Sequence, residues 1–162
     1  MSIEYFQRRQ NILREKIAKE NLDGMLVTNL THIRYLCGFT GSSATLLITD
    51  DEIYFITDGR YVVQSEKEVK GANVIIDSIP HFEVIKNRGL LKNEQKIGFD
   101  GNNVTHQGYQ QISKVLSSQH LVNITGVIEK LAMVKDDKEL EAIKTAVEIT
   151  DKAFSEVLPM VQ

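Results

Sequence analysis

The chain has 162 residues, of which 42% are hydrophobic, so it has the length of one domain and enough apolar side chains for an ordinary core. Nineteen basic against 22 acidic residues give a net charge of -3, which leaves no cationic field to attract nucleic acid, and we expect no nucleic-acid partner. The longest apolar runs are strand-sized and the N-terminus does not resemble a signal peptide, so we expect a cytoplasmic protein without membrane contact.

The first part of the chain is predicted to form two helices and three strands. In chain order, the patterns predict a helix over residues 3–20, a strand over 25–28, a helix over 30–36, and strands over 44–49 and 53–57. Ser2 and Asn29 are placed to cap the two helices, and Gly38 is placed to end the second. A short acidic turn joins the last two strands, which predicts a β-hairpin.

The following part is predicted to alternate helices with strands. In chain order, we expect a helix over residues 59–69, a strand over 73–76, a helix over 81–91 interrupted near Gly89, a strand over 96–99, a helix that begins after Thr105, and a strand over 121–124. Asp58 is placed to cap the first of these helices. The helical side chains expected to face the core are Tyr61, Val62, Ser65, Tyr109, Ile112 and Leu116.

These alternating elements predict an α/β fold, in which a mixed β-sheet is covered by helices on both faces. One long helix is predicted over residues 137–158, outside this alternation. Its apolar stripe consists of Leu140, Ile143, Val147, Thr150, Phe154 and Val157. Such a stripe needs a surface against which to bury.

The run GFTGSS, residues 38–43, is typical of a turn and has the small residues that phosphate-binding loops and nucleophile elbows use. A phosphate-binding loop would need a following Lys and helix, whereas a strand comes next. A nucleophile elbow would need Gly-x-Ser-x-Gly between a strand and a helix, which is also absent from this run. Neither chemistry is predicted for the loop.

Other reactive side chains form no catalytic pattern in the sequence. Cys37 lies near His32, but a lone cysteine beside apolar neighbours typically behaves as a small buried side chain, and a single cysteine forms no internal disulfide. His32, His81, His106 and His120 show no metal-ligand spacing. We therefore expect no catalytic residue, no metal ligand and no cofactor in this chain.

Four sequence segments together resemble a known family. They read IRYLCGFTGS, FITDGRY, KIGFDG and LAMVKDDKELEAIKTAVEITDKAF. Their order and spacing are similar to the N-terminal domain of Xaa-Pro peptidases, namely aminopeptidase P and prolidase of the creatinase-like superfamily. The resemblance implies a creatinase/prolidase N-terminal domain over residues 1–133. It also implies that residues 134–162 are a linker and the first helix of a pita-bread catalytic domain.

The resemblance further implies an activity for the longer parent protein. Relatives hydrolyse the peptide bond before proline with two divalent metal ions, manganese or cobalt, held by two Asp, one His and two Glu. All of these ligands are expected beyond Gln162, so this chain alone is expected to be inactive. Proline-containing peptides would be the substrates of the full-length enzyme, and a homodimer is implied.

The resemblance also suggests a role for the loop. In relatives it projects into the active site of the neighbouring subunit, which would make Phe39, Thr40, Gly41 and Ser42 substrate-lining residues, with Phe39 providing an apolar surface. The alternative is that the loop only connects a helix to a strand. Asp58, Arg60 and Tyr61 form a structural or interface motif in this interpretation. Helix capping by Asp58 and an ion pair of Arg60 would explain two of them without any function.

Two functional hypotheses follow. The chain is either the non-catalytic N-terminal domain of a metal-dependent Xaa-Pro peptidase, contributing to dimerisation and to the partner's substrate site, or a protein-interaction module of a creatinase-like pseudo-enzyme. The sequence does not distinguish an aminopeptidase from a dipeptidase.

Overall fold

The computed structural model describes residues 2–160, which form two compact units separated between Leu131 and Ala132. The strands are β1 (Gly24–Val27), β2 (Thr45–Thr49), β3 (Ile53–Thr57), β4 (Asn73–Ile76), β5 (Lys96–Phe99) and β6 (His120–Asn123). The α-helices are α1 (Ile3–Lys19), α2 (Leu30–Cys37), α3 (Val62–Glu68), α4 (His81–Asn87), α5 (His106–Val115), α6 (Val127–Met133) and α7 (Asp137–Val157). Two 3-10 helices, η1 (Gly59–Tyr61) and η2 (Leu158–Met160), complete the described elements.

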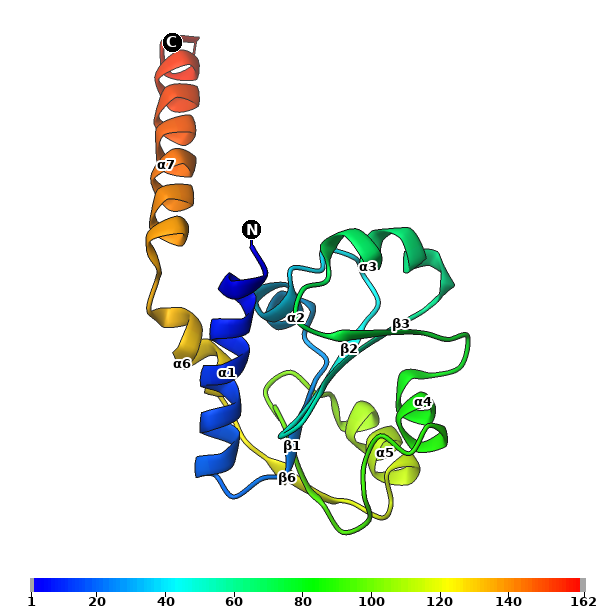
Figure 1. Ribbon diagram of the computed structural model, residues 1–162. Coiled ribbons are helices and arrows are strands. Elements are labelled where there is room, and N and C mark those ends of the chain that lie inside the picture. Colours follow the sequence, from blue (N-terminus) through cyan, green and yellow to red (C-terminus); the bar gives the residue numbers. More distant parts are fainter. Residues whose placement is uncertain (1, 161–162) are drawn as a thin grey trace. The chain divides into compact units, whose positions relative to one another are not determined.

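The strands form one mixed sheet in the order β4-β3-β2-β1-β5-β6. Strand β2 pairs antiparallel with both β1 and β3, which gives the predicted hairpin. The pairs β3 with β4, β1 with β5, and β5 with β6 are parallel. The predicted fold class, a mixed α/β sheet with helices on both faces, is confirmed (Figure 1).

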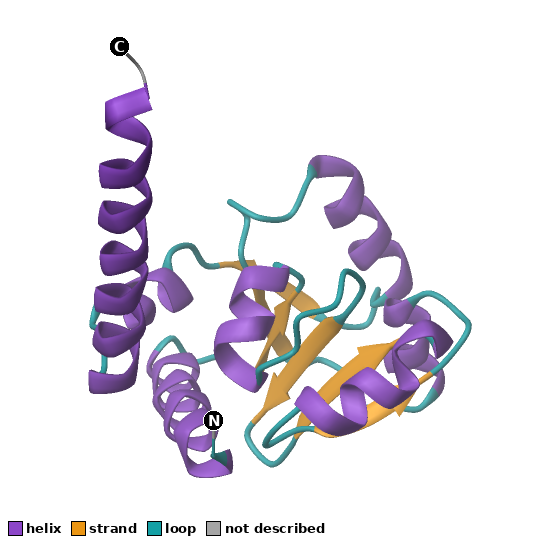
Figure 2. Ribbon diagram, turned by 90° about the horizontal axis from the view of Figure 1, so that it is seen from above, coloured by secondary structure: helices purple, strands orange, loops and turns teal. Residues whose placement is uncertain are grey.

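Two hydrophobic cores lie on opposite faces of the sheet, because successive side chains of a strand point to opposite faces. Met25 and Val27 belong to the first core and Leu26 to the second. Helices α1, α2 and α6 contribute Leu13, Ile17, Ile33, Leu36 and Ile128 to the first core, whereas α4 and α5 contribute Val84, Ile85 and Ile112 to the second. Figure 2 shows this sheet with helices on both of its faces.

Three of the four predicted side-chain caps are present. Asn29 accepts hydrogen bonds from the amides of Thr31 and His32, and Gly38 ends α2 in the left-handed conformation. Thr105 caps α5, and Asp58 caps the 3-10 turn that precedes α3. Ser2 occupies the N-cap position of α1 but makes no side-chain capping bond, so the prediction that it caps this helix is wrong.

Two side chains predicted to face the core are exposed. Val62 is 39% exposed, and Ser65 is the side chain that α3 buries. The chain enters α3 through the 3-10 helix η1, which has three residues per turn, so the side of α3 that faces the core differs from the one expected for a continuous α-helix. Tyr109 is also 39% exposed, although its ring packs on Phe99 with 5.2 Å between centroids. Helix α6 was not predicted from the sequence, since its seven residues include one buried side chain, Ile128.

The second unit contains the predicted long helix, α7. Asp136 and Glu139 form a reciprocal capping box at its N-terminus. All residues of its apolar stripe are exposed, and α7 buries none of its side chains. Among residues 2–160, no helix combines the length and the apolar character that a membrane crossing requires.

Candidate functional site

The loop between α2 and β2 begins with a glycine that no other residue replaces easily. Gly38 has a φ of 89°, in the left-handed region that favours glycine. A Cβ at this position would lie 2.9 Å from Cζ of Phe6 and 3.0 Å from the carbonyl oxygen of Glu68. The backbone of the loop is therefore fixed at its first residue.

Phe39 lies in the core, and the expectation that its ring provides an apolar surface is wrong. Its side chain is only 1% exposed. The ring packs edge-on against Phe55 and Tyr61, with centroids 4.7 and 5.4 Å apart. A large apolar side chain gains more free energy in the core than in a solvated loop, so Phe39 anchors the loop.

Thr40 is exposed and is held by a carboxylate of α3. Its amide donates to Oε2 of Glu68 at 2.8 Å, and its hydroxyl donates to the same carboxylate. Gln64 donates to Oγ1 of Thr40 at 3.0 Å and to Glu68. Burial opposes ionisation of Glu68, but the hydrogen bonds from Thr40 and Gln64 outweigh it and hold the pKa of Glu68 below its ordinary value.

The next two residues pack against Tyr61. A Cβ at Gly41 would lie 2.7 Å from Cε1 of Tyr61 and would also overlap the ring of Phe39, so this position requires glycine. The hydroxyls of Ser42 and Tyr61 are hydrogen-bonded at 2.7 Å, and this bond lowers the pKa of Tyr61. Loop and η1 thus form one polar surface.

Asp58 and Arg60 form an exposed ion pair beside this surface. Arg60 donates from Nε and Nη2 to the two carboxylate oxygens of Asp58, at 2.8 and 2.9 Å, and its amide also donates to Asp58. These bonds hold the pKa of Asp58 well below its ordinary range. Asp58 caps the 3-10 helix η1, and Arg60 pairs with Asp58. Capping and ion pairing therefore explain these two residues without any further function.

The loop surface offers hydroxyl and backbone groups for binding but no nucleophile paired with a base among its described residues. Cys37, directly before Gly38, is buried and donates to the carbonyl oxygen of Ile33 at 3.2 Å. Burial raises the pKa of the Cys37 thiol to about 11, so the thiol stays protonated at neutral pH. Its interpretation as a small buried side chain is confirmed.

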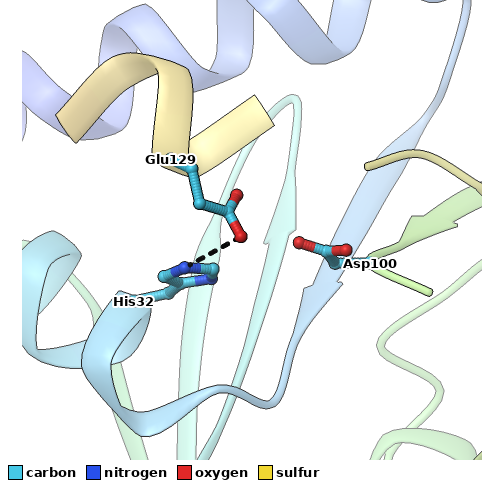
Figure 3. Close-up of side chains that lie close together, drawn as sticks. All are labelled: His32, Asp100 and Glu129. Carbon is cyan, nitrogen blue, oxygen red and sulfur yellow. Dashed lines mark ion pairs between the residues drawn. The ribbon is translucent and has the colours of Figure 1, made fainter. Parts of the chain in front are cut away.

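A second group of polar residues was not indicated by spacing in the sequence. His32 of α2, Asp100 after β5 and Glu129 of α6 lie with one ligand-type atom each within 4.8 Å of one another (Figure 3). Nε2 of His32 lies 3.5 Å from Oε1 of Glu129. Three separate segments meet here, so only the folded structure brings these side chains together.

Taken together, the mixed sheet, the helices on both faces and the anchored loop define a mixed α/β domain. The chain belongs to the creatinase/prolidase N-terminal domain family, whose model matches residues 9–134. The resemblance carried by the four sequence segments is thereby confirmed.

Individual relatives agree with this assignment. An uncharacterized peptidase of Bacillus subtilis (strain 168), YqhT, is 34% identical over 156 residues, which cover 90% of this chain and 41% of that protein. An Xaa-Pro dipeptidase structure from Bacillus anthracis has a TM-score of 0.90 at 28% identity and covers 97% of this chain and 44% of its own. The N-terminal domain of the cytoplasmic peptidase PepQ from Mycobacterium tuberculosis H37Rv has a TM-score of 0.67 at 30% identity, covering 76% of this chain and 98% of that domain. The chain therefore spans less than half the length of the first two relatives.

Proposed function

We propose that this chain is the non-catalytic N-terminal domain of a metal-dependent Xaa-Pro peptidase and that its loop helps to form the substrate site of a partner subunit. The substrates are peptides with proline after the scissile bond, and the enzyme acts as a homodimer. The dipeptidase and peptidase descriptions of the relatives support the reaction class. A cytoplasmic location is supported by the description of the mycobacterial relative.

One observation carries the role of the loop. Phe39 and the two glycines fix the backbone, while Thr40 and Ser42 remain exposed. Glu68 and Tyr61 hold these two residues through hydrogen bonds, so the loop is ordered before it meets a ligand. A pre-ordered loop loses little conformational entropy on binding, which suits a wall of a substrate site. In this proposal Thr40, Gly41 and Ser42 line the site, and Phe39 supports them from the core.

The motif of Asp58, Arg60 and Tyr61 supports the loop from the side. Tyr61 contacts Phe39 and Ser42, and Arg60 lies 5.3 Å from the centre of the Tyr61 ring. We assign these three residues a structural role at the subunit interface rather than a direct contact with the substrate.

The two divalent metal ions of the proposed enzyme do not fit the described residues of this chain. A two-metal site needs five ligands of the stated types, whereas residues 2–160 bring together one group of three, formed by one His and two acids. The hydrolytic chemistry is therefore assigned to the part of the relatives' length that this chain does not cover. The 162-residue chain alone is expected to be inactive towards Xaa-Pro peptides.

Kinetics of the full-length protein test the role of the loop. Thr40→Ala and Ser42→Ala should each raise KM for Xaa-Pro peptides with little change in Tm, because they remove exposed binding groups. Ser117→Ala, an exposed serine outside the loop, should leave both quantities unchanged. Loop variants with wild-type kinetics on peptides of two and three residues would reject the role of the loop. Light scattering of the same samples tests the proposed dimer.

A further inference from the structure

The group of His32, Asp100 and Glu129 lies apart from the loop and has no role in the proposed function. Its members come from the first turn of α2, the turn after β5, and α6. Their side chains converge on one another from three elements (Figure 3). The ligand-type atoms lie within 4.8 Å of one another, which places the two carboxylates close together. Two neighbouring carboxylates repel each other unless a positive charge lies between them.

The hydrogen bonds of this group are incomplete. His32 is buried, with 8% of its surface exposed, and its Nδ1 has no hydrogen-bond partner among the described residues. Oε2 of Glu129 is also enclosed and without such a partner. Buried polar atoms are normally satisfied by protein, water or an ion. An ion beside Glu129 would give its Oε2 a partner, whereas Nδ1 of His32 points away from the atom that faces Glu129, which is Nε2.

A small cavity adjoins the group. His32, Asp100, Asn103 and Ile128 line it, together with residues of β1. About 10 Å³ of it is open to the centre of a water-sized sphere, which is the room that one water or one small ion requires. The cavity therefore selects against an organic ligand.

Two asparagines position the donor atoms. Asn29 holds the amide of His32 with Oδ1 and donates from Nδ2 to Oδ1 of Asn103 at 2.6 Å. Asn103 in turn donates to Asp100 at 2.9 Å and to Glu129 at 3.4 Å. The N-cap of α2 is thus connected to both carboxylates. Outer hydrogen bonds of this kind orient the ligands of metal sites.

We propose that His32, Asp100 and Glu129 bind one divalent transition-metal ion, with Zn²⁺ as the best-suited ion. One imidazole and two carboxylates are a ligand set that Zn²⁺ accepts, with water in the fourth position. Donor atoms at about 2.0–2.2 Å from a tetrahedral Zn²⁺ lie roughly 3.3–3.6 Å apart. The 3.5 Å between His32 Nε2 and Glu129 Oε1 already meets this spacing. The ligand-type atom of Asp100 lies within 4.8 Å of the other two, so binding would draw this side chain closer to them.

The ion would have a structural effect on α6. This helix is short and buries only Ile128, and its attachment to α2 and to the turn after β5 would be strengthened by a shared ion. Glu129 lies two residues before the separation of the two units. The site therefore fixes the last segment of the first unit.

Calorimetric titration of the metal-free 162-residue chain with Zn²⁺ tests the site. We expect one ion per chain, and we expect Glu129→Gln to weaken binding at least about tenfold because a charged ligand is lost. The matched control is Glu94→Gln. Glu94 forms an exposed ion pair with His120 at 2.8 Å but has no third ligand, so its loss should leave the affinity unchanged.

Thermal unfolding provides an independent readout that does not involve activity. The same excess of Zn²⁺ should raise the Tm of the wild-type chain and of Glu94→Gln by equal amounts, and that of Glu129→Gln by clearly less. Asp100→Asn serves as a second ligand variant if Glu129→Gln does not fold. Absence of stoichiometric binding, or equal binding by wild type and both ligand variants, overturns the site and leaves the group as a contact between His32 and Glu129.

Discussion

The ring of Phe39 connects the exposed loop to the first core. It packs against Phe55 of β3 and against Tyr61, whose hydroxyl bonds Ser42. One buried side chain thus determines the position of the polar groups that follow it. A variant at this residue acts on the whole loop through packing.

Phe39→Ala should lower the free energy of unfolding by about 3–5 kcal/mol, the usual range for removing a buried aromatic ring. Urea unfolding of the 162-residue chain measures this loss. Val63→Ala is the control, because Val63 is 61% exposed and its truncation should change the free energy by less than about 0.5 kcal/mol. Equal effects of the two substitutions would mean that the ring of Phe39 is not packed in solution.

The buried thiol of Cys37 makes the free energy of unfolding depend on pH in the alkaline range. Its pKa is raised from 9.0 to about 11 by burial, so the folded state holds the proton more tightly than the unfolded state. The stabilisation is complete below pH 9 and is lost as pH rises through about 11.

We expect the unfolding free energy of the wild type to fall by about 2–3 kcal/mol more than that of Cys37→Ala over this range. Chemical unfolding at several pH values measures both proteins. Lys and Tyr residues titrate in both, so their contributions cancel in the difference between wild type and Cys37→Ala. Parallel pH profiles would show that the thiol is accessible. If the wild type loses more stability than Cys37→Ala, native Cys37 should also react slowly with a thiol reagent at pH 8 and fast in urea.

Among the elements, α2 is placed by the side chain at its N-terminus. Asn29 accepts two helix amides, and its Nδ2 reaches Asn103 in the turn after β5. The cap therefore joins a helix to a neighbouring connection of the sheet. By contrast, α1 begins at Ser2 without such a bond.

Asn29→Ala should lower the unfolding free energy by about 1–2 kcal/mol, since a capping side chain is lost. Ser2→Ala provides a matched control at a second helix start and should have almost no effect, because no capping bond is made there. Denaturant midpoints of the two variants give the comparison. The structural account of capping fails if the two substitutions are equally mild.

Elements whose signals are local could be predicted from the sequence. The caps at Asn29 and Thr105 act over two or three residues, and the strand patterns of the hairpin are continuous, so both were predicted correctly. Burial of Phe39 was not predictable, because a residue in a loop shows no periodicity that reveals where its side chain points. The metal-type group was missed for a related reason. His32, Asp100 and Glu129 meet only after the sheet has formed, and their spacing along the chain has no meaning by itself.

At the scale of the whole molecule, α7 is the α-helix that buries no side chain among residues 2–160. Its stripe includes Leu140, Ile143, Val147 and Phe154, all of them exposed. Side chains of this size stabilise by about 1.5–3 kcal/mol each when fully buried. A surface of this kind usually marks an interface.

We expect the 162-residue chain to self-associate through α7 at high concentration, and a version ending at residue 136 to remain monomeric. Light scattering over a concentration series measures both. Phe154→Ser in the longer chain should weaken association without changing the Tm of the first unit, whereas Ser155→Ala should do neither. A strictly monomeric chain whose α7 amides are fully protected from hydrogen exchange would contradict this expectation.

The strand order also has a kinetic consequence. Strands β2 and β3 are neighbours in both the sequence and the sheet, whereas β1 must pair with β5 across a long intervening segment. Closing a long loop is slower than closing a hairpin, so local pairing precedes the parallel pairing. During synthesis on the ribosome, the hairpin and α2 emerge before β5 exists. Until β5 arrives, β1 has one unpaired edge. The group of His32, Asp100 and Glu129 therefore assembles late: His32 emerges first, the turn with Asp100 follows β5, and Glu129 comes last with α6.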